Sequence, residues 1–140
     1  MIHVKMENPS REEIGRILKN AKRIAVVGLS DDPYRTSNSV SLAMQDAGYE
    51  IIPVNPMIEE ALGVKAVDSL EDIDGPIDIV NVFRRSEFVT EIAKEAVRVN
   101  AKVFWTQLDV VSEEGYQITK DHGMDVVMDR CIKVEHSITV

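Results

Sequence analysis

Hydroxyl, amide and guanidinium side chains crowd one short stretch of the chain, directly after the apolar run RIAVVGL (23–29). The stretch consists of Gly28 at the turn followed by Ser30, Arg35, Thr36, Ser37, Asn38 and Ser39. It has no second and third glycine where a dinucleotide fingerprint would place them. A helix that begins near Ser37 would instead present unpaired backbone N–H groups and the positive end of its dipole, and Arg35 would add charge-assisted hydrogen bonds. This combination predicts a phosphate site, unless Ser37 or Asn38 only caps the helix in a solvent-facing loop.

Two further apolar runs also end in polar groups. The residues after them are Asn55 and Pro56 for one run, and Phe83, Arg84 and Arg85 for the other. Many NAD-binding folds have an acidic residue at the position of Asn55, where it holds the ribose hydroxyls. A neutral amide beside two cations suits a phosphorylated ribose better, so these residues favour NADP or coenzyme A. Arg85 could alternatively form a solvated ion pair with Glu87.

A fourth apolar run carries Trp105 and ends at Gln107. Packing in the core is the commoner place for a tryptophan, but at a crevice Trp105 could wall the apolar tail of a ligand. Gln107 offers an amide donor and acceptor to another amide, such as those of a pantetheine arm.

No catalytic constellation is visible in the sequence. None of the three histidines, His3, His122 and His136, pairs by sequence with a serine, cysteine or aspartate as a triad would. Zinc-binding H-E-x-x-H and C-x-x-C motifs and the P-loop are also absent. We therefore lean away from an enzyme. The single cysteine, Cys131, is expected to be structural, and whether it reaches a ligand thiol stays open.

Alternating helix and strand patterns must position these groups. Helices are predicted over 10–21, 37–47, 86–99 and 112–122, with Ser10, Ser86 and Ser112 as N-caps. Strands are predicted over 23–29, 49–56, 76–83, 101–107 and 124–129, with a short edge strand and a turn of helix over 63–74. Buried strands that alternate with helices predict an α/β, Rossmann-like three-layer sandwich whose five-stranded parallel sheet has the order 3-2-1-4-5. A ligand should then bind beyond the carboxyl ends of the strands, at the switch between strands one and four.

Composition limits the classes of function. The 140 residues suit a single domain, with residues 1–21 as a helical lead-in, and 44% apolar residues supply a core. The net charge of −8 argues against a nucleic-acid partner but permits a small phosphorylated ligand at a local basic site. No apolar run approaches the ~20 residues that span a bilayer, so no membrane contact is expected. Without a visible secretory signal, and with one cysteine, we expect a cytoplasmic protein.

Five segments together resemble the small single-domain CoA-binding proteins, and through them the N-terminal CoA-binding domain of the succinyl-CoA synthetase alpha subunit. They are RIAVVGLS with Arg35-Thr36-Ser37, GYEIIPVNP (48–56), DIVNVFRR (78–85), VFWTQLDVVSEEG (103–115) and VVMDRCIKVEH (126–136). The match runs over about residues 12–137. It implies a Rossmann-like fold that binds coenzyme A or an acyl-CoA, with no established catalytic activity of its own. The synthetase's phosphohistidine belongs to another domain, so ligase activity is not implied.

The resemblance also implies a role for each stretch. The residues from Gly28 to Ser39 would hold the pyrophosphate. Asn55, Pro56, Phe83 and Arg84 would lie by the adenosine and its 3′-phosphate, while Trp105 and Gln107 would lie towards the crevice.

The chain departs from the family pattern at Thr36, where relatives often have proline, and at Asp109, where they often have glycine. The carboxylates of Asp31, Asp32 and Asp109 would have to face away from ligand phosphates or pair with cations. Two other functions stay open: an NADP-dependent oxidoreductase, and a regulatory or interaction domain with a vestigial nucleotide crevice. A homodimer or an unidentified protein partner is compatible with each.

Overall fold

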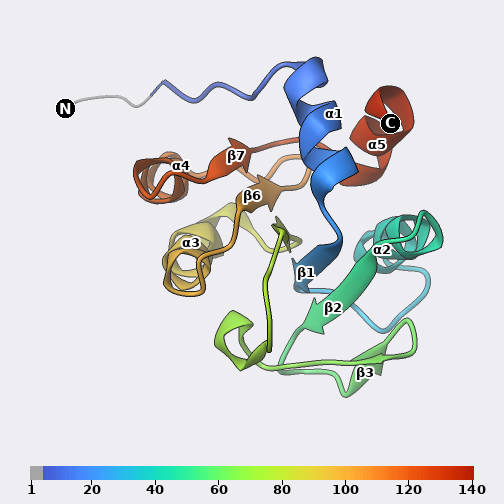
Figure 1. Ribbon diagram of the computed structural model, residues 1–140. Helices are drawn as coiled ribbons and strands as arrows, with labels where there is room; N and C mark the ends of the chain where they lie inside the picture. Colours follow the sequence, from blue (N-terminus) through green and yellow to red (C-terminus); the bar gives the residue numbers. More distant parts are fainter. Residues whose placement is uncertain (1–4) are drawn as a thin grey trace.

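A parallel β-sheet runs through the centre of the molecule and carries helices on both faces (Figure 1). The computed structural model describes residues 5–140. The strands of the central sheet are β1 (Arg23–Val27), β2 (Glu50–Val54), β5 (Ile79–Val82), β6 (Val103–Thr106) and β7 (Asp125–Val127). The helices are α1 (Arg11–Asn20), α2 (Thr36–Asp46), α3 (Val89–Arg98), α4 (Glu113–Asp121) and α5 (Ile132–Thr139). None of the helices in this part of the chain is long and apolar enough to cross a membrane.

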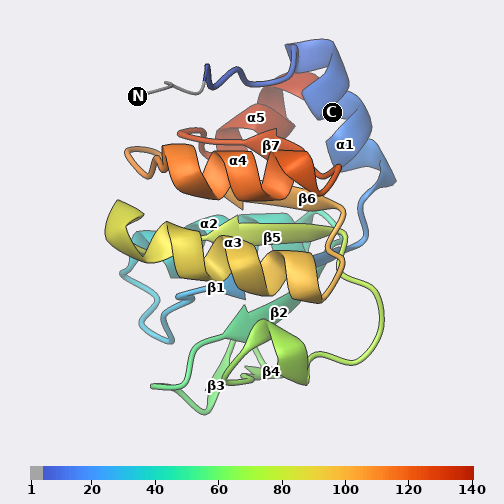
Figure 2. The same cartoon turned by 90° about the vertical axis from the view of Figure 1, so that its left-hand side faces the viewer.

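Each strand alternates its apolar side chains between two cores. Ile24 and Val26 of β1 pack with α1, α2 and α5, whereas Ala25 and Val27 pack with α3 and α4. Figure 2 shows α3 and α4 in front of the sheet and α2 and α5 behind it. Burial of one such aliphatic side chain contributes about 1.5–3 kcal/mol, so these two layers hold the sheet in place. The expected α/β, Rossmann-like class with a five-stranded parallel sheet is confirmed.

The strands lie in the order β2-β1-β5-β6-β7. One isolated parallel bridge, Val54 to Val67, adds the segment around Val67 outside β2. With that segment counted as the third strand along the chain, the main sheet reads 3-2-1-4-5-6, so the expected Rossmann order holds. The segments of the chain that take the third and fourth places differ from the prediction, however. The strand over 76–83 was expected at the edge, and instead it is β5 and pairs with β1.

This shift moves the switch point. The segment over 63–74 takes the edge place with only one bridge, because it is short and polar, and the chain then crosses back over β1. The switch therefore falls between β1 and β5, not between β1 and the strand that carries Trp105.

The helix boundaries follow the capping residues with one exception. The Ser10 and Ser112 hydroxyls accept hydrogen bonds from the backbone N–H of Glu13 and Gly115, as expected for N-caps. Ser86 is not the cap of α3. It begins a 3₁₀ turn (Ser86–Phe88), and its hydroxyl accepts a hydrogen bond from Val111 N instead.

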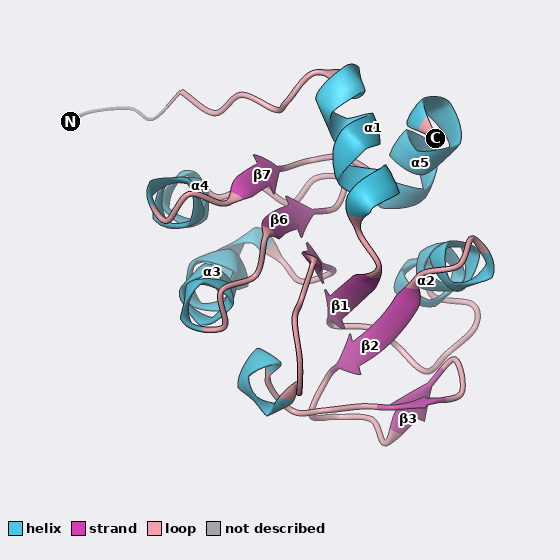
Figure 3. Cartoon of the chain, viewed as in Figure 1, coloured by secondary structure: helices cyan, strands magenta, loops and turns pink. Residues whose placement is uncertain are grey.

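A small hairpin pairs β3 (Glu60–Ala61) with β4 (Val64–Lys65) beyond the edge of the main sheet (Figure 3). The short strand and the turn of helix predicted over 63–74 correspond to β4 and to a 3₁₀ helix (Leu70–Asp72). Strand β3 and helix α5 lie outside the sequence prediction. Helix α5 packs beside α1, and its sequence, IKVEHSIT, has only Ile132 and Glu135 buried. Strands of two residues and a helix with so narrow a buried face leave little periodic signal.

Candidate ligand cleft

Three depressions adjoin one another at the carboxyl ends of β1, β2, β5 and β6. We call them the loop pocket (≈550 Å³), the edge pocket (≈420 Å³) and the apolar pocket (≈590 Å³). The loop pocket shares Gly28 and Asn55 with the edge pocket, and Thr36 and Phe83 with the apolar pocket. Arg84 borders both the edge and the apolar pocket. The three therefore form one continuous cleft along the switch point.

Gly28 allows the β1 loop to pass close to the end of β5. Its φ of +87° is rarely adopted by other residues, and its N–H donates to Val54 O at 2.9 Å. A Cβ on Gly28 would lie 2.6 Å from Phe83 O and 2.9 Å from Arg84 Cδ. Only glycine fits where the loop, edge and apolar pockets meet.

The loop pocket lies at the N-terminus of α2. Arg35 is the N-cap and its side chain makes no capping hydrogen bond. Asn38 N donates to Arg35 O, so the N–H groups of Thr36 and Ser37 are the candidates to bind a ligand. Thr36 and Ser37, the first two residues of the helix, line the pocket together with Ser30 and Arg35. A helix N-terminus beside a guanidinium is an arrangement that binds phosphate oxygens.

Ser37 and Asn38 hold this loop in shape. Ser37 Oγ accepts from Ser30 N at 3.0 Å, and Asn38 Nδ2 donates to Ser30 O at 2.9 Å. Both side chains are buried and neither caps α2, although residues 31–36 of the loop are exposed, as the alternative expected. Ser39 lies outside the three pockets, where its hydroxyl donates to Thr36 O.

The aspartates of the same loop do not border the cleft. Asp32 Oδ1 accepts from Tyr34 N at 2.9 Å, and the Asp32 carbonyl accepts from Arg35 N at 3.0 Å. Asp32 thus builds the turn that leads into α2. Neither Asp31 nor Asp32 is among the residues that line the loop, edge and apolar pockets.

The edge pocket brings together Asn55, Pro56 and Arg84. Asn55 Nδ2 donates to Leu29 O at 3.0 Å and its Oδ1 accepts from Met57 N at 2.9 Å, so this side chain ties two loops together. The Arg84 guanidinium carbon lies 4.3 Å from the centre of the Phe88 ring. This cation–π contact leaves the nitrogen donors of Arg84 for another partner.

Two carboxylates line the edge pocket, and an exposed cation, Arg85, lines the neighbouring apolar pocket. Glu95, which lines it, accepts hydrogen bonds from Ser69 Oγ and from Leu70 N. Asp68 also lines it and follows the edge bridge at Val67. Arg85 forms an exposed ion pair with Glu87 at 3.7 Å, which is the alternative that its position in the sequence left open.

The apolar pocket is lined by Phe83, Leu108 and Val110, with Gln107 and Cys131 beside them. Gln107 is only 5% exposed, and its Nε2 donates to Asn81 Oδ1 at 2.7 Å. Asp109 borders this pocket too. Its φ of +67° explains why a glycine suits the position, and its N–H donates to Asp129 Oδ1 at 2.7 Å.

Trp105 is the one predicted contact residue that the structure places wholly in the core. Its side chain has no exposed surface, and its Nε1 donates to Arg130 O at 2.8 Å. The expectation that it could wall a ligand tail is wrong, because β6 turns this side chain towards the α1, α2 and α5 layer. The apolar walls come instead from Leu108 and Val110, just after the strand, which sequence reasoning missed. An apolar pair exposed beyond a strand end was the signal for them.

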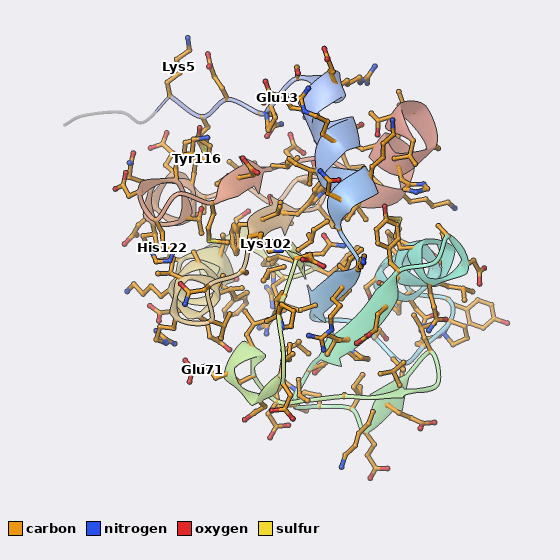
Figure 4. The ribbon with its side chains drawn as sticks, in the orientation of Figure 1. Lys5, Glu13, Glu71, Lys102, Tyr116 and His122 are labelled. Atoms are coloured by element: carbon orange, nitrogen blue, oxygen red, sulfur yellow. The ribbon has the colours of Figure 1, made fainter. Side chains whose placement is uncertain are left out.

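At the opposite end of the sheet, where the parallel strands begin, charged side chains pair with one another. A separate depression of ≈350 Å³ there is bordered by Glu13 and Lys102, both labelled in Figure 4, and by Asp78. Asp78 Oδ2 accepts from the backbone N–H of Lys22 and Arg23, and its Oδ1 lies 3.3 Å from Lys102 Nζ. Burial alone would raise the pKa of Asp78. These hydrogen bonds and the Lys102 charge together lower the pKa by a larger amount, so it lies below the usual value. These contacts hold the beginnings of the neighbouring strands together and therefore stabilise the fold.

The two histidines that the structure describes lie away from the cleft. His122, labelled in Figure 4, follows α4 and hydrogen-bonds Asn100 at 3.0 Å, and His136 packs edge-on against Tyr49. His3 lies outside the described residues. Within residues 5–140 no group of three or more His, Cys, Asp or Glu side chains could hold a metal ion.

The fold and the cleft define a Rossmann-like domain with a candidate ligand site at its switch point. Comparison with known proteins agrees. The family of the CoA binding domain matches residues 22–137. The uncharacterized protein YneT of Bacillus subtilis (strain 168) is 65% identical over 134 residues, which cover 96% of this chain and 99% of that protein. A hypothetical protein from Pyrococcus horikoshii OT3 has a similar structure, with a TM-score of 0.91 at 32% identity over 97% of this chain and 98% of that chain.

A longer relative is the alpha subunit of the ADP-forming acetate–CoA ligase II of Pyrococcus furiosus. It is 27% identical over 126 residues, which cover 82% of this chain but only 28% of that subunit. The chain therefore belongs to the family of CoA-binding domains, and the resemblance inferred from its motifs is confirmed.

Proposed function

We propose that this protein binds coenzyme A or an acyl-CoA in the cleft formed by the loop, edge and apolar pockets. The observation that carries the proposal is the order of the pockets. The loop pocket, with a helix N-terminus, adjoins a mixed polar pocket on one side and an apolar one on another. Coenzyme A has the same order of parts: a phosphorylated adenosine, a pyrophosphate and a pantetheine arm.

In this arrangement the N-terminus of α2 and Arg35 bind the pyrophosphate. The adenosine lies in the edge pocket beside Asn55 and Pro56, with its 3′-phosphate on Arg84. The pantetheine arm extends over Phe83 and Leu108 to Gln107, whose amide can bond an amide of the arm.

The proposal includes binding and no reaction. Thermal unfolding of the protein with coenzyme A, with dephospho-CoA and with NADPH, each in the presence of a reducing agent, tests it. A ligand at 100 times its Kd stabilises the folded state by about 2.7 kcal/mol. We expect coenzyme A to raise the Tm most. A larger increase with NADPH, or none with millimolar coenzyme A, would overturn the proposal.

A further inference from the structure

Cys131 lies in the part of the cleft that the proposed function assigns to the pantetheine arm. It borders the apolar pocket directly before α5, is partly exposed, and is the only cysteine of the chain. Its thiol caps no backbone N–H of α5. Because Cys131 is the only cysteine, an internal disulfide is impossible, and no capping hydrogen bond occupies its thiol.

Gln107, in the same pocket, independently indicates a ligand. Its side chain is 95% buried, and its Nε2 is used by Asn81. Within residues 5–140 no donor hydrogen-bonds Gln107 Oε1. This oxygen is nevertheless not fully buried, because the only fully buried side-chain polar atom without a partner there is Ser41 Oγ. Gln107 Oε1 is therefore reached from the pocket. An N–H group of a ligand in the pocket can therefore donate to this oxygen in place of water.

We propose that Cys131 is a site of reversible covalent attachment for the thiol of coenzyme A, which rests on the function proposed above. With the pyrophosphate at α2 and an amide of the pantetheine arm at Gln107, the arm ends at Cys131. The reactant is the disulfide of coenzyme A. The Cys131 thiolate attacks one sulfur, a Cys131–S–S–CoA bond forms, and the original S–S bond breaks. The second coenzyme A leaves as a thiolate that takes up the proton released by Cys131, so the number of disulfides is unchanged.

Attachment should depend on the nucleotide half of the ligand, because the cleft would hold the reacting sulfur next to Cys131. Pantethine, the disulfide of pantetheine, has the same reactive bond and lacks the nucleotide. We expect coenzyme A disulfide to modify Cys131 at least about tenfold faster than pantethine does at the same concentration.

Mass spectrometry of the intact, non-reduced protein measures both rates. The expected product is one coenzyme A per chain, on the peptide that contains Cys131, and dithiothreitol should remove it. Cys131→Ser should gain no mass from either disulfide. The nucleotide fragment of coenzyme A, which has no thiol, should slow attachment in the wild-type protein.

The two proposals fail in different ways. Equal rates for the two disulfides, or no adduct, would overturn covalent attachment, while stabilisation of the wild-type protein by coenzyme A in reducing agent would still support binding. Absence of that stabilisation would overturn both.

Discussion

Arg84 is the residue that we propose binds the 3′-phosphate of coenzyme A. It borders both the edge and the apolar pocket, and its guanidinium is held over Phe88. A hydrogen bond to a charged group contributes about 1.5–3 kcal/mol, so we expect Arg84→Ala to weaken coenzyme A binding by about tenfold or more. Dephospho-CoA, which lacks the 3′-phosphate, should lose little. Titration calorimetry with both ligands measures the difference.

A matched control for Arg84 lies on α1. Arg16→Ala removes the same charge from the far edge of the sheet, where Arg16 pairs with Glu12. It controls for the change in net charge. If Arg84→Ala weakened both ligands equally, the guanidinium would not bind the 3′-phosphate.

Gly28 gives a second test at the scale of one residue. Gly28→Ala adds a strained backbone and a Cβ within 2.6 Å of Phe83 O, so the end of the strand must shift. Gly123→Ala adds similar strain, since its φ is +89°, but no atom lies within 4 Å of its Cβ. Strain of this kind costs about 1–2 kcal/mol. We expect denaturant unfolding to show a larger loss for Gly28→Ala, together with weaker coenzyme A binding. Equal losses would contradict the role of the close approach.

At the scale of the element, the β1 loop and α2 act as one unit. Ser37→Ala removes the acceptor for Ser30 N, whereas Ser39→Ala removes an exposed hydroxyl whose bond to Thr36 O stays within the same helix. We expect Ser37→Ala to lower the free energy of unfolding by about 1–2 kcal/mol, and Ser39→Ala by less than about 0.5 kcal/mol. Faster hydrogen exchange at Ser30 in the Ser37 variant alone would show that the loop has loosened. Equal exchange in both variants would contradict this account.

The elements that the sequence predicts best are those with a strong periodic or capping signal. Ser10 and Ser112 cap α1 and α4 as their spacing indicates, because their local hydrogen bonds do not depend on the rest of the fold. Ser86 has the same residue type, but a tertiary contact with Val111 takes its hydroxyl. The place of β5 beside β1 is set by tertiary pairing between the two strands, which no local pattern reveals.

The residues of the candidate site also differ in how well the sequence predicts them. Gly28, Arg35, Asn55 and Arg84 could be selected because they follow apolar strands, and the carboxyl ends of parallel strands share one edge. Trp105 lies inside the strand itself, where the direction of the side chain decides its fate, and it points into the core. The contributions of Asp68 and Glu95 to the edge pocket depend on the path of the crossing segment, which the sequence leaves open.

At the scale of the whole molecule, the two edges of the sheet differ in their charges. The carboxyl edge offers the α2 N-terminus and Arg84 to a ligand, whereas Asp78 at the amino edge ties β1, β5 and the residue before β6 together. The protein carries a net charge of −8, so its affinity for a polyanion depends on this local arrangement. The amino edge contributes stability, and the carboxyl edge is the candidate site.

Asp78 predicts how stability depends on pH. Because its pKa in the folded protein lies below the value in the unfolded chain, its contribution is present above about pH 4 and is lost as the pH falls through the lower, folded-state pKa. We expect Asp78→Asn to reduce the free energy of unfolding at pH 7 and to reduce it less at pH 3. Urea unfolding at both pH values measures this, with the exposed Asp46→Asn as the control for net charge. A difference that does not change with pH would contradict the prediction.

The central claim is that coenzyme A occupies the cleft between β1 and β5. The most direct measurement is a titration of the ¹⁵N-labelled protein with coenzyme A in reducing agent, followed by amide chemical shifts. We predict that the shifts change at Gly28, Thr36, Ser37 and Arg84, while those at the opposite edge, such as Glu13 and Lys102, stay constant. No change at millimolar ligand, or changes confined to that opposite edge, would contradict the claim.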